Sequence, residues 1–574
     1  MNRITGFLFA AGLLLTGCAR TGSTFHADGA FHLSACHPHA DGLTDDTPAF
    51  RQLLEQVGGA GGGVVTIPPG DYFLSGSEPL PVPSRTTVFA YGARFFLPQT
   101  LGDQARIVLF EGTDVTDFTW FGGFFKGYCF DPAAEENPWE PNVTTRIFVV
   151  QASERGVAGG LKFRDISADR VAGAVVNVIG YSPHGEDSDD HADIHFVTDV
   201  SVENCTFLNT GKFMWDYGYL WQLLVFAEEY APAEVEMAQK YFFNELIRKN
   251  VRIEDGGNRV YFDNTVAEPL ERNQTLCFYH DRLPDNIVRG KRYYVAESTA
   301  EYITVSEQPD GKQPVTFRGA GGDGVQLVSN LWHAFMDLYA PKGAGPGKGC
   351  IDLMRCRNTK ITGCTISAQG DAMHVYCSQN NLIANNQILG ARMGAFFLAE
   401  YSKNSTVTGN TVDGTNGSRV LSIERSNEDV TLVGNVFRNG GRGCWINQPK
   451  NLVIQGNVFV NNTTKGIKDP RKGRRDFKTG GWQSFPELYF STYQPGATYG
   501  PVLLSGNLFE TSTEAAAVIH FAEYGRGITV SGNTFSGATG LILTDEDSSE
   551  TDLSGNRGAT VRKGKDPSLQ FANE

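Results

Sequence analysis

The chain has 574 residues, of which 41% are hydrophobic and 20% are charged, a composition typical of a folded globular protein. Its formal net charge of −15 argues against nucleic acid as a main partner, because phosphate binding requires a basic surface. Beyond the first residues, no segment approaches the roughly 18 apolar residues that a membrane-spanning helix needs. The cysteines after Cys18 form no CxxC pairs, which fits neither a zinc framework nor a dense disulfide scaffold.

Residues 1–18 have the pattern of an export signal, with a basic start at Arg3, an apolar stretch and a Leu-Thr-Gly-Cys ending at Cys18. This ending resembles the lipobox of bacterial lipoproteins, in which the cysteine is lipidated and becomes the new N-terminus. Because Ala19 rather than Asp follows the cysteine, the resemblance implies an outer-membrane lipoprotein that faces the periplasm or the cell surface. The alternative is an ordinary signal peptide with a chance cysteine. Residues 19–35 are then a linker.

Residues 36–211 begin the folded part. The stretch DGLTDDTPAFRQLLEQVGGAGGG at 41–63 predicts an acidic turn, a short helix around residues 49–57 and a tight glycine turn. The following VVTIPPGDYFL predicts the first strand.

Residues 212–345 interrupt this region as an insertion. Its first part has helical periodicity and many aromatic residues, and residues 283–329 predict a small all-β module of short strands. We expect the insertion to wall a cleft, although a purely structural insert is the alternative. Trp215 is a candidate for stacking on a sugar face, or else a core residue of the insertion.

Residues 346–560 repeat one pattern, a short β-branched strand followed by Gly-Asn or a related turn, and 561–574 form a tail. The Asn or Cys of the turn recurs at positions 364, 386, 410, 435, 457, 507 and 533, in steps of 22, 24, 25, 22, 50 and 26 residues. An earlier member of the series is Cys205. The step of 50 is either two turns of the chain or one turn with an excursion at 465–500. A period in the twenties with apolar residues at every second position predicts a solenoid of stacked strands.

The opening block and the repeated xGNxF pattern resemble the pectate-lyase/rhamnogalacturonase superfamily, over residues 30–210 and 350–560. The resemblance implies an all-β, right-handed parallel β-helix, with DGLTDDTPAF…GGGVVTIPPGDY as its N-terminal helical cap. A cap is physically necessary because an open solenoid end exposes unpaired backbone and core. The fold alone does not fix a substrate.

Side chains of a strand alternate between core and solvent, so the repeat predicts which residues face outward. The coil that ends at Asn435 fits this alternation only if its turn is one residue longer than in the other coils. The residues expected inside are Ile351, Leu353, Met373, Val375, Phe397, Ala399, Leu421, Ile423, Cys444 and Ile446. The residues expected outside form two columns. The first contains Asp352, His374, Leu398, Ser422 and Trp445, and the second contains Met354, Tyr376, Glu400, Glu424 and Asn447.

The outward columns predict an exposed strip rich in carboxylates and edged by aromatic residues, the chemistry that cleaves glycosidic bonds. Glu400 and Glu424 would stack on adjacent strands at roughly 5 Å, a distance that suits hydrolysis with retention of the anomeric configuration. Asp352 and Glu400 would lie roughly 10 Å apart, a distance that suits hydrolysis with inversion. The sequence leaves this choice open. The alternative is a solvated polar surface, but stacked like charges need a shared proton or a nearby Arg425 or Arg392.

The candidate catalytic residues are Asp352, Asp371, His374, Glu400 and Glu424. Asp371, in QGDAMHVY, lies at the position where β-helix glycosidases often carry a catalytic aspartate, so the resemblance implies a catalytic role. The alternative is that Asp371 is a turn residue. The candidate substrate-binding residues are Tyr376, Arg392, Arg425, Trp445, Asn447 and Trp215. The acidic, histidine-containing loop 184–195 offers oxygen ligands for Ca²⁺ but lacks a recognised ligand spacing, so no metal or cofactor is predicted.

The pattern therefore predicts an exported, monomeric glycoside hydrolase whose partner is a poly- or oligosaccharide. The motifs of pectate lyases are absent and those of polygalacturonases incomplete. One alternative is a polysaccharide lyase or epimerase, in which His374, Tyr376 or an arginine acts as base on a uronate. Another is a non-catalytic glycan-binding surface protein.

Overall fold

The computed structural model describes residues 29–98, 106–128, 144–185, 190–211, 247–262, 349–391, 394–414, 419–440, 444–462, 486–492, 494, 496–511 and 517–564, with most of 270–329. Cys18, Trp215, Arg392 and the predicted helical segment of the insertion lie outside the described residues. Among the residues described, no helix is long and apolar enough to cross a membrane.

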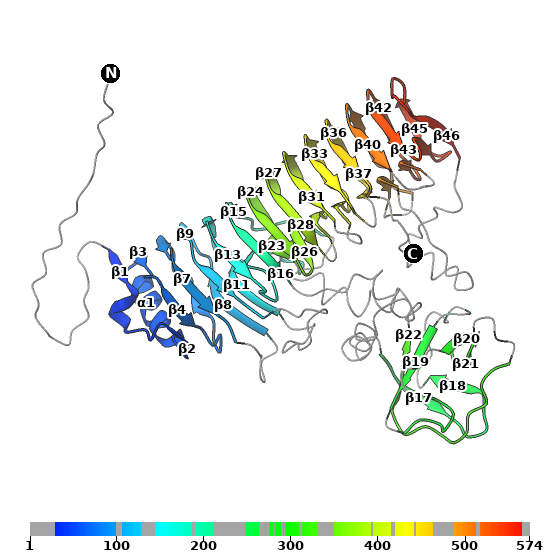
Figure 1. Ribbon diagram of the computed structural model, residues 1–574, viewed down its shortest axis with the longest axis horizontal. Helices are drawn as coiled ribbons and strands as arrows, with labels where there is room; N and C mark the ends of the chain where they lie inside the picture. Colours follow the sequence, from blue (N-terminus) through cyan, green and yellow to red (C-terminus); the bar gives the residue numbers. More distant parts are fainter. Residues whose placement is uncertain are drawn as a thin grey trace, which may run out of the picture.

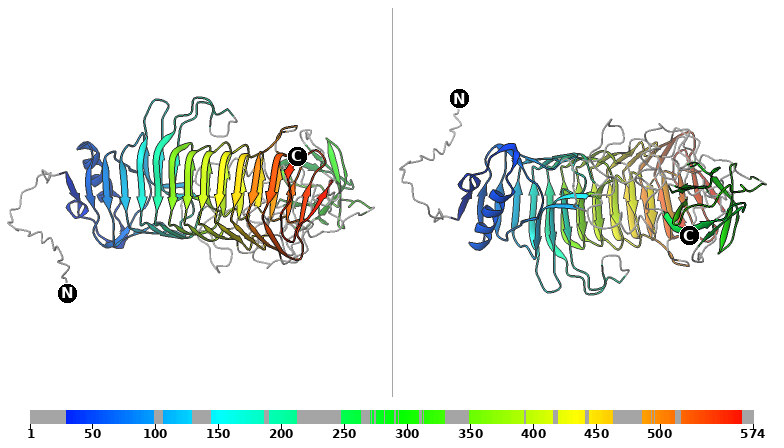
Figure 2. Two further views of the ribbon diagram at one scale, coloured as in Figure 1. Left: turned by 90° about the horizontal axis from the view of Figure 1, so that it is seen from above. Right: turned by 90° about the horizontal axis from the view of Figure 1, so that it is seen from below.

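Three long sheets of parallel strands run along the molecule, and each coil of the chain gives one strand to each sheet (Figures 1 and 2). Sheet A contains, in spatial order, β1 (Ala30–His32), β3 (Gly63–Thr66), β6 (Thr86–Phe89), β9 (Phe118–Phe121), β12 (Gly159–Arg164), β15 (Val197–Glu203), β24 (Cys356–Thr362), β27 (Gln379–Ala384), β30 (Lys403–Thr408), β33 (Glu428–Val433), β36 (Lys450–Gln455), β39 (Val502–Ser505), β42 (Arg526–Ser531) and β45 (Ser549–Asp552). Sheet B contains β2 (Asp41–Asp45), β4 (Gly70–Phe73), β7 (Ala93–Phe96), β10 (Phe124–Lys126), β13 (Ser167–Asp169), β16 (Thr206–Thr210), β25 (Thr365–Ala368), β28 (Gln387–Ala391), β31 (Thr411–Asp413), β34 (Val436–Arg438), β37 (Val458–Val460), β40 (Leu508–Thr511) and β43 (Thr534–Gly537). Sheet C contains β5 (Leu80–Pro81), β8 (Arg106–Thr113), β11 (Thr144–Gln151), β14 (Val176–Ile179), β23 (Gly349–Met354), β26 (Asp371–Tyr376), β29 (Phe396–Ala399), β32 (Leu421–Ile423), β35 (Cys444–Asn447), β38 (Leu488–Ser491), β41 (Ile519–Phe521), β44 (Leu541–Thr544) and β46 (Thr560–Lys563).

The predicted parallel β-helix is therefore confirmed, and the ambiguous step of 50 residues is resolved. Asn457 donates its backbone N–H to Oδ1 of Asn507 at 2.9 Å, and β36 pairs directly with β39. The step is thus one coil with a long excursion. The insertion also leaves the stack unbroken, because β14 pairs with β23 and β16 with β25 across it.

The N-terminal cap is built by the acidic turn and α1 (Thr47–Gly59), which follows a 3-10 turn at Leu33–Cys36. Asp45 accepts the backbone N–H of Thr47 at 3.0 Å, satisfying a donor at the helix start. Asp41 accepts the backbone N–H groups of Thr44 and Leu43, and these bonds lower the pKa of Asp41 to about 2. The apolar face of α1, including Phe50 and Leu53, is buried against the first coil, so the helix closes the solenoid as predicted.

A ladder of buried asparagines runs along the turn between sheets A and B. In each step, an asparagine Oδ1 accepts both the backbone N–H and the Nδ2–H of the preceding one, as Asn435 does from Asn410 at 3.0 and 2.9 Å. Nδ2 of Asn435 also donates to the Val407 carbonyl at 2.9 Å. Because buried amides and carbonyls need partners, the ladder fixes each coil against the next.

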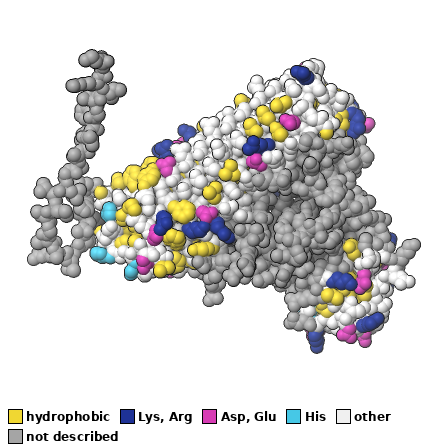
Figure 3. All heavy atoms as spheres, in the orientation of Figure 1, with side chains coloured by type: hydrophobic (Ala, Val, Ile, Leu, Met, Phe, Trp, Pro, Cys, Tyr) yellow, Lys and Arg dark blue, Asp and Glu magenta, His cyan; other side chains and the backbone are white. Residues whose placement is uncertain are grey.

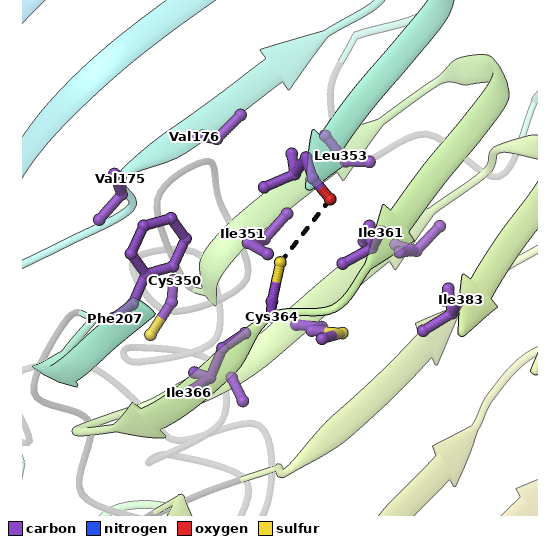
Figure 4. Packing of buried hydrophobic residues seen from close by; sticks show 14 of the residues in the cluster. Val175, Val176, Phe207, Cys350, Ile351, Leu353, Ile361, Cys364, Ile366 and Ile383 are labelled. Atoms are coloured by element: carbon purple, nitrogen blue, oxygen red, sulfur yellow. Dashed lines mark hydrogen bonds between the residues drawn. The ribbon is translucent and has the colours of Figure 1, made fainter. Parts of the chain in front are cut away.

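Apolar side chains fill the space between the three sheets. Figure 4 shows part of this core, where Cys364, a member of the ladder column, donates Sγ–H to the Val202 carbonyl at 3.7 Å. Seven described cysteines are free and buried, so Cys205 and Cys364 act as small core residues, as expected. Burial raises the pKa of Cys377 to about 11.

The inserted β module is a closed antiparallel barrel, shown as a separate unit in Figure 1. Its strands, in spatial order, are β17 (Ile247–Ile253), β18 (Arg259–Phe262), β21 (Tyr302–Ser306), β20 (Tyr293–Ser298), β19 (Thr275–Tyr279) and β22 (Val325–Ser329). The predicted boundary of 283–329 was wrong at its start, because β17, β18 and β19 precede residue 283. Val251, Val260 and Leu276 from these strands belong to the same small core as Val295, so the barrel needs them to close.

Asn435→Ala should lower the free energy of unfolding by about 2–4 kcal/mol, because it leaves several buried polar groups without partners. The matched control is Asn404→Gly, which removes an exposed asparagine at a left-handed position (φ 52°) that glycine adopts freely. Urea denaturation followed by circular dichroism measures both. Equal losses in the two variants would contradict the ladder's role.

Candidate functional site

The candidate site lies on the outer face of sheet C, whose strand register decides which side chains face outward. Asp352 pairs with His374, and Ser422 pairs with Trp445, as the sequence predicts. The strand between them differs, because His374 pairs with Phe397, and Tyr376 with Ala399. Phe397 and Ala399 therefore face outward and Leu398 packs in the main core, the reverse of the predicted pattern.

The cause is an extra residue in one turn. Between β26 and β27 only Cys377 has a positive φ, whereas Glu400 and Tyr401 both do between β29 and β30. The same two-residue turn occurs at Arg425 and Ser426, where the sequence required it. Since successive strand residues point to opposite faces, one extra residue exchanges the two faces of the preceding strand.

This shift also separates the two glutamates. Leu398 pairs with Ile423, so Glu424 follows opposite Ala399, and Glu400 lies opposite Arg425. The prediction that Glu400 stacks directly on Glu424 is wrong for the same reason. The carboxylates occupy neighbouring coils but not the same column.

Each glutamate has its own arginine. Glu400 forms an ion pair with Arg425, one of the two arginines that the sequence proposed as partner. Glu424 accepts a hydrogen bond from Nη1 of Arg419 at 3.0 Å. The glutamate side chains are 18% and 19% exposed, so they are reachable yet partly desolvated.

Arg419 joins this pair to an aromatic surface. Its guanidinium lies 4.3 Å from the ring centroid of Trp445, a cation–π contact. The Trp445 indole N–H donates to Oγ of Ser491 at 3.2 Å, and Nδ2 of Asn447 donates to the same oxygen at 3.0 Å. These bonds fix the orientation of the indole against Arg419.

Asp352 and His374 form a buried pair. Nδ1 of His374 lies 2.9 Å from Oδ1 of Asp352, and the residues are 3% and 0% exposed. The carboxylate orients the ring and favours a proton on Nδ1, which leaves Nε2 as the acceptor in the neutral ring. Such a histidine is suited to proton transfer.

The predicted strip is less exposed than expected around this pair. Tyr376, Phe397 and Met354 form a second apolar cluster outside the sheet, to which Ile194 also contributes. His191 of the same loop lies with its ring 4.1 Å from that of Tyr401. Segment 190–195 therefore packs on these turns, which explains the burial of Tyr376.

Asp371 lies at the start of its strand, against the neighbouring coil. Its Oδ1 accepts the backbone N–H of Gly394 at 2.7 Å, and the residue is fully buried. Gly394 in turn bridges to Arg419 in the next coil. Asp371 and Arg419 thus share one edge of sheet C, two coils apart.

Arg419 was missed by the sequence analysis, although the repeat contains a signal for it. Continuing the column of Asp371 by one coil gives Gly394, and by a second coil gives Arg419. This column lies at the strand start, outside the two outward columns.

The acidic loop 184–195 is described only in part. His184 lies 3.5 Å from Asp190, and the Gly185 carbonyl accepts a hydrogen bond from Arg355 at 3.1 Å. Within the described part of the chain, no group of three or more His, Cys, Asp or Glu residues is placed to hold a metal ion. The Ca²⁺ hypothesis stays untested.

On the face that Figure 3 shows, several Lys and Arg side chains lie beside Asp or Glu side chains. Examples are Arg164 with Glu203 at 2.7 Å and Lys403 with Glu428 at 3.0 Å, both on sheet A. Exposed pairs of this kind contribute little to stability and supply control positions for the site.

The family model described as right handed beta helix region matches residues 342–469. The chain is a right-handed parallel β-helix. No curated protein matches the amino-acid sequence.

Solved structures of similar shape include the A-module of mannuronan C-5 epimerase AlgE6 from Azotobacter vinelandii. It is 10% identical, with a TM-score of 0.48, over 94% of this chain and 99% of that one. PfbA, a surface adhesin of Streptococcus pneumoniae, is 10% identical with a TM-score of 0.44 over 93% of each chain. The catalytic unit of a GH87 α-1,3-glucanase from Streptomyces thermodiastaticus is 11% identical with a TM-score of 0.40, over 96% of this chain and 72% of that one. At these identities the likeness concerns the fold.

Gly394→Ala should displace the Asp371 carboxylate, because an added Cβ would lie 2.8 Å from its Oδ1. We expect a loss of about 1–3 kcal/mol in stability, measured by thermal or urea unfolding. Gly59→Ala is the control, because its Cβ would meet nothing within 4 Å. An unchanged stability of Gly394→Ala would mean that Asp371 moves aside without cost.

Proposed function

We propose that this protein is a glycoside hydrolase that acts on an oligo- or polysaccharide bound along the outer face of sheet C. The observation that carries the proposal is the arrangement of Glu424, Arg419 and Trp445. A partly exposed carboxylate, its arginine partner and an oriented indole meet there on one rigid sheet. The resemblance of the N-terminal cap to carbohydrate-active β-helices supports the same substrate class.

Glu424 accepts a hydrogen bond from Arg419 at 3.0 Å and is partly exposed, so we assign it the role of base or nucleophile. The second carboxyl group of a glycosidase must donate a proton to the leaving oxygen. Two residues of the site are candidates for this role: Glu400, on the neighbouring coil, and Asp371, at the same edge of the sheet as Arg419. Trp445 offers an apolar ring face for a sugar.

Glu424→Gln should reduce the hydrolysis of the best substrate by at least about 10³-fold, because the amide has no charge and accepts no proton. The measurement is the release of reducing ends from a panel of neutral, sulfated and uronate glycans. Glu400→Gln and Asp371→Asn, assayed in parallel, separate the two candidates for the acid.

Glu428→Gln is the matched control. It removes a glutamate that also pairs with a cation, Lys403 at 3.0 Å, but lies on sheet A. Its activity should equal that of the wild type. If Glu424→Gln retains full activity while folding normally, this site is not where hydrolysis occurs.

The buried Asp352–His374 pair favours a second candidate, a lyase or epimerase acting on a uronate. In that reaction a base removes the proton next to the uronate carboxylate, and an oriented histidine is suited to this step. His374→Asn places an amide near Nδ1, so it can keep the bond to Asp352 while removing Nε2. An ultraviolet-absorbing unsaturated product, lost in His374→Asn, would favour elimination over hydrolysis.

We also propose that Cys18 carries a lipid that anchors the protein in the outer membrane. The support is the lipobox-like ending of residues 1–18. Cys18→Ala should move the protein from the membrane fraction to the soluble periplasmic or secreted fraction, or leave it unprocessed. Immunoblotting of fractionated cells checks this, with metabolic labelling by a palmitate analogue. Labelling that persists in Cys18→Ala would refute the assignment.

A further inference from the structure

Hydrophobic side chains gather on the outer surface of the first coils, at the N-terminal end of the molecule (Figure 3). On sheet A, Val64 of β3 is 44% exposed and Phe89 of β6 is 38% exposed. Tyr91, in the turn after β6, is 51% exposed, and Phe121 of β9 is half-buried beside Phe89. These four residues form what we call the N-terminal patch. Single exposed apolar residues are ordinary, but a group of them indicates a binding surface.

The four side chains of the N-terminal patch are continuous. Val64 and Phe89 point outward from strands that pair directly with each other. The ring of Tyr91 lies against the turn that follows Phe121, because a Cβ added at Gly122 would come within 2.7 Å of Cδ1 of Tyr91. The patch therefore extends over three neighbouring coils of sheet A.

The orientation of the rings suits a lipid better than a sugar. The rings of Phe89 and Phe121 are nearly parallel, at 7°, with centroids 5.1 Å apart. Their faces are turned toward each other, so their edges point to the surroundings. A stacked sugar needs an open ring face, whereas apolar edges can insert between lipid acyl chains. The Tyr91 hydroxyl group donates to Asp165 at 2.5 Å, which gives this exposed ring the amphipathic character common at membrane surfaces.

Charged side chains lie at the rim of the patch and do not interrupt it. Lys162 and Arg164 follow on β12, where the guanidinium of Arg164 lies 5.9 Å from the ring centroid of Phe121. Arg164 also forms an ion pair with Glu203 at 2.7 Å. Basic side chains beside an apolar surface are typical of proteins that lie on membranes, because they meet the lipid phosphates.

The N-terminal patch lies where the described chain begins. The backbone N–H of Val64 donates to the carbonyl of Gly29 at 2.8 Å, and ten residues, 19–28, separate Gly29 from Cys18. At no more than about 3.6 Å per residue, this stretch spans roughly 40 Å at most. Sheet A has 14 strands about 4.8 Å apart and is therefore roughly 60 Å long. A lipid on Cys18 would thus hold the N-terminal end of sheet A near the membrane without restraining the other end.

We propose that the N-terminal patch docks on the surface of the membrane that holds the lipid of Cys18. The inference rests on the lipid anchor proposed above and adds a second contact, which orients the solenoid on the membrane. Because this contact uses sheet A, the outer face of sheet C around Glu424 is left free for a glycan.

The experiment places a reporter beside the patch in the lipidated protein. Thr87→Cys, labelled with the fluorescent dye NBD, is reconstituted into vesicles of phosphatidylethanolamine and phosphatidylglycerol, and spin-labelled acyl chains quench the dye where it enters the lipid. Labelled wild type gives the background from native cysteines, of which the seven described are buried. Adding Phe89→Ser should reduce the quenching at least about twofold, because the apolar contact is lost.

Val433→Ser, added to the same labelled protein, is the matched control. Val433 is 36% exposed and belongs to the same outward column of sheet A as Phe89, but lies far from the patch. Its loss should leave the quenching unchanged. Tyr91→Ser, outside the strands, should act like Phe89→Ser, so the test does not depend on the folding of one variant. Circular dichroism establishes that each variant folds.

The outcomes distinguish this inference from the anchor on which it rests. Absence of a lipid on Cys18 would overturn both. A lipidated protein whose dye is not quenched, or is quenched equally with and without the patch substitutions, would overturn the docking alone. A dye signal that changes with protein concentration in the absence of vesicles would show that a second copy covers the patch, and would also overturn it.

Discussion

The asparagine ladder is the interaction on which the rest of the structure depends. Each coil turns sharply between sheets A and B, and the turn buries backbone groups that no strand partner reaches. Asn410, Asn435 and Asn457 satisfy these groups and one another at once, so every coil is fixed against its neighbours in one register. This constraint determines which outward-facing side chains of sheet C are aligned. The number of residues between the ladder and sheet C depends on the length of the turn between them.

That dependence explains what could be predicted from the sequence. The ladder is visible as a repeated Asn or Cys, so the solenoid and the alignment of Asp352 with His374 followed from counting, whereas the cap followed from the resemblance of the opening block to a known superfamily. The error at Phe397 and Leu398 arose between the ladder and sheet C, where Glu400 lengthens one turn by one residue. The length of this turn can differ between coils while the ladder stays the same. Because Phe397, Leu398 and Ala399 are all apolar, their sequence does not indicate which of them face the core.

The sequence proposed Arg425 as a partner, but it could not assign each glutamate its own arginine, for a related reason. Glu424 pairs with Arg419 at the start of the same strand, and Glu400 pairs with Arg425 on the next coil. Both contacts depend on the direction in which each turn projects its side chain. Periodicity identifies the column of a residue, but turn conformation decides its partner. The result is a face in which each glutamate is individually balanced, so the two are electrostatically more independent than a stacked pair would be.

The insertion leaves the solenoid and returns to it between strands that pair directly with each other, β14 with β23 and β16 with β25. The pairing of the coils therefore does not depend on what the inserted segment contains. The entropy cost of closing such a loop grows only with the logarithm of its length, about 0.6 kcal/mol for each doubling. A segment of this size is thus almost as easily accommodated as a short loop, and it could be gained, exchanged or lost as one unit. The strand pairing of sheet C on both sides of the insertion is for this reason independent of the barrel.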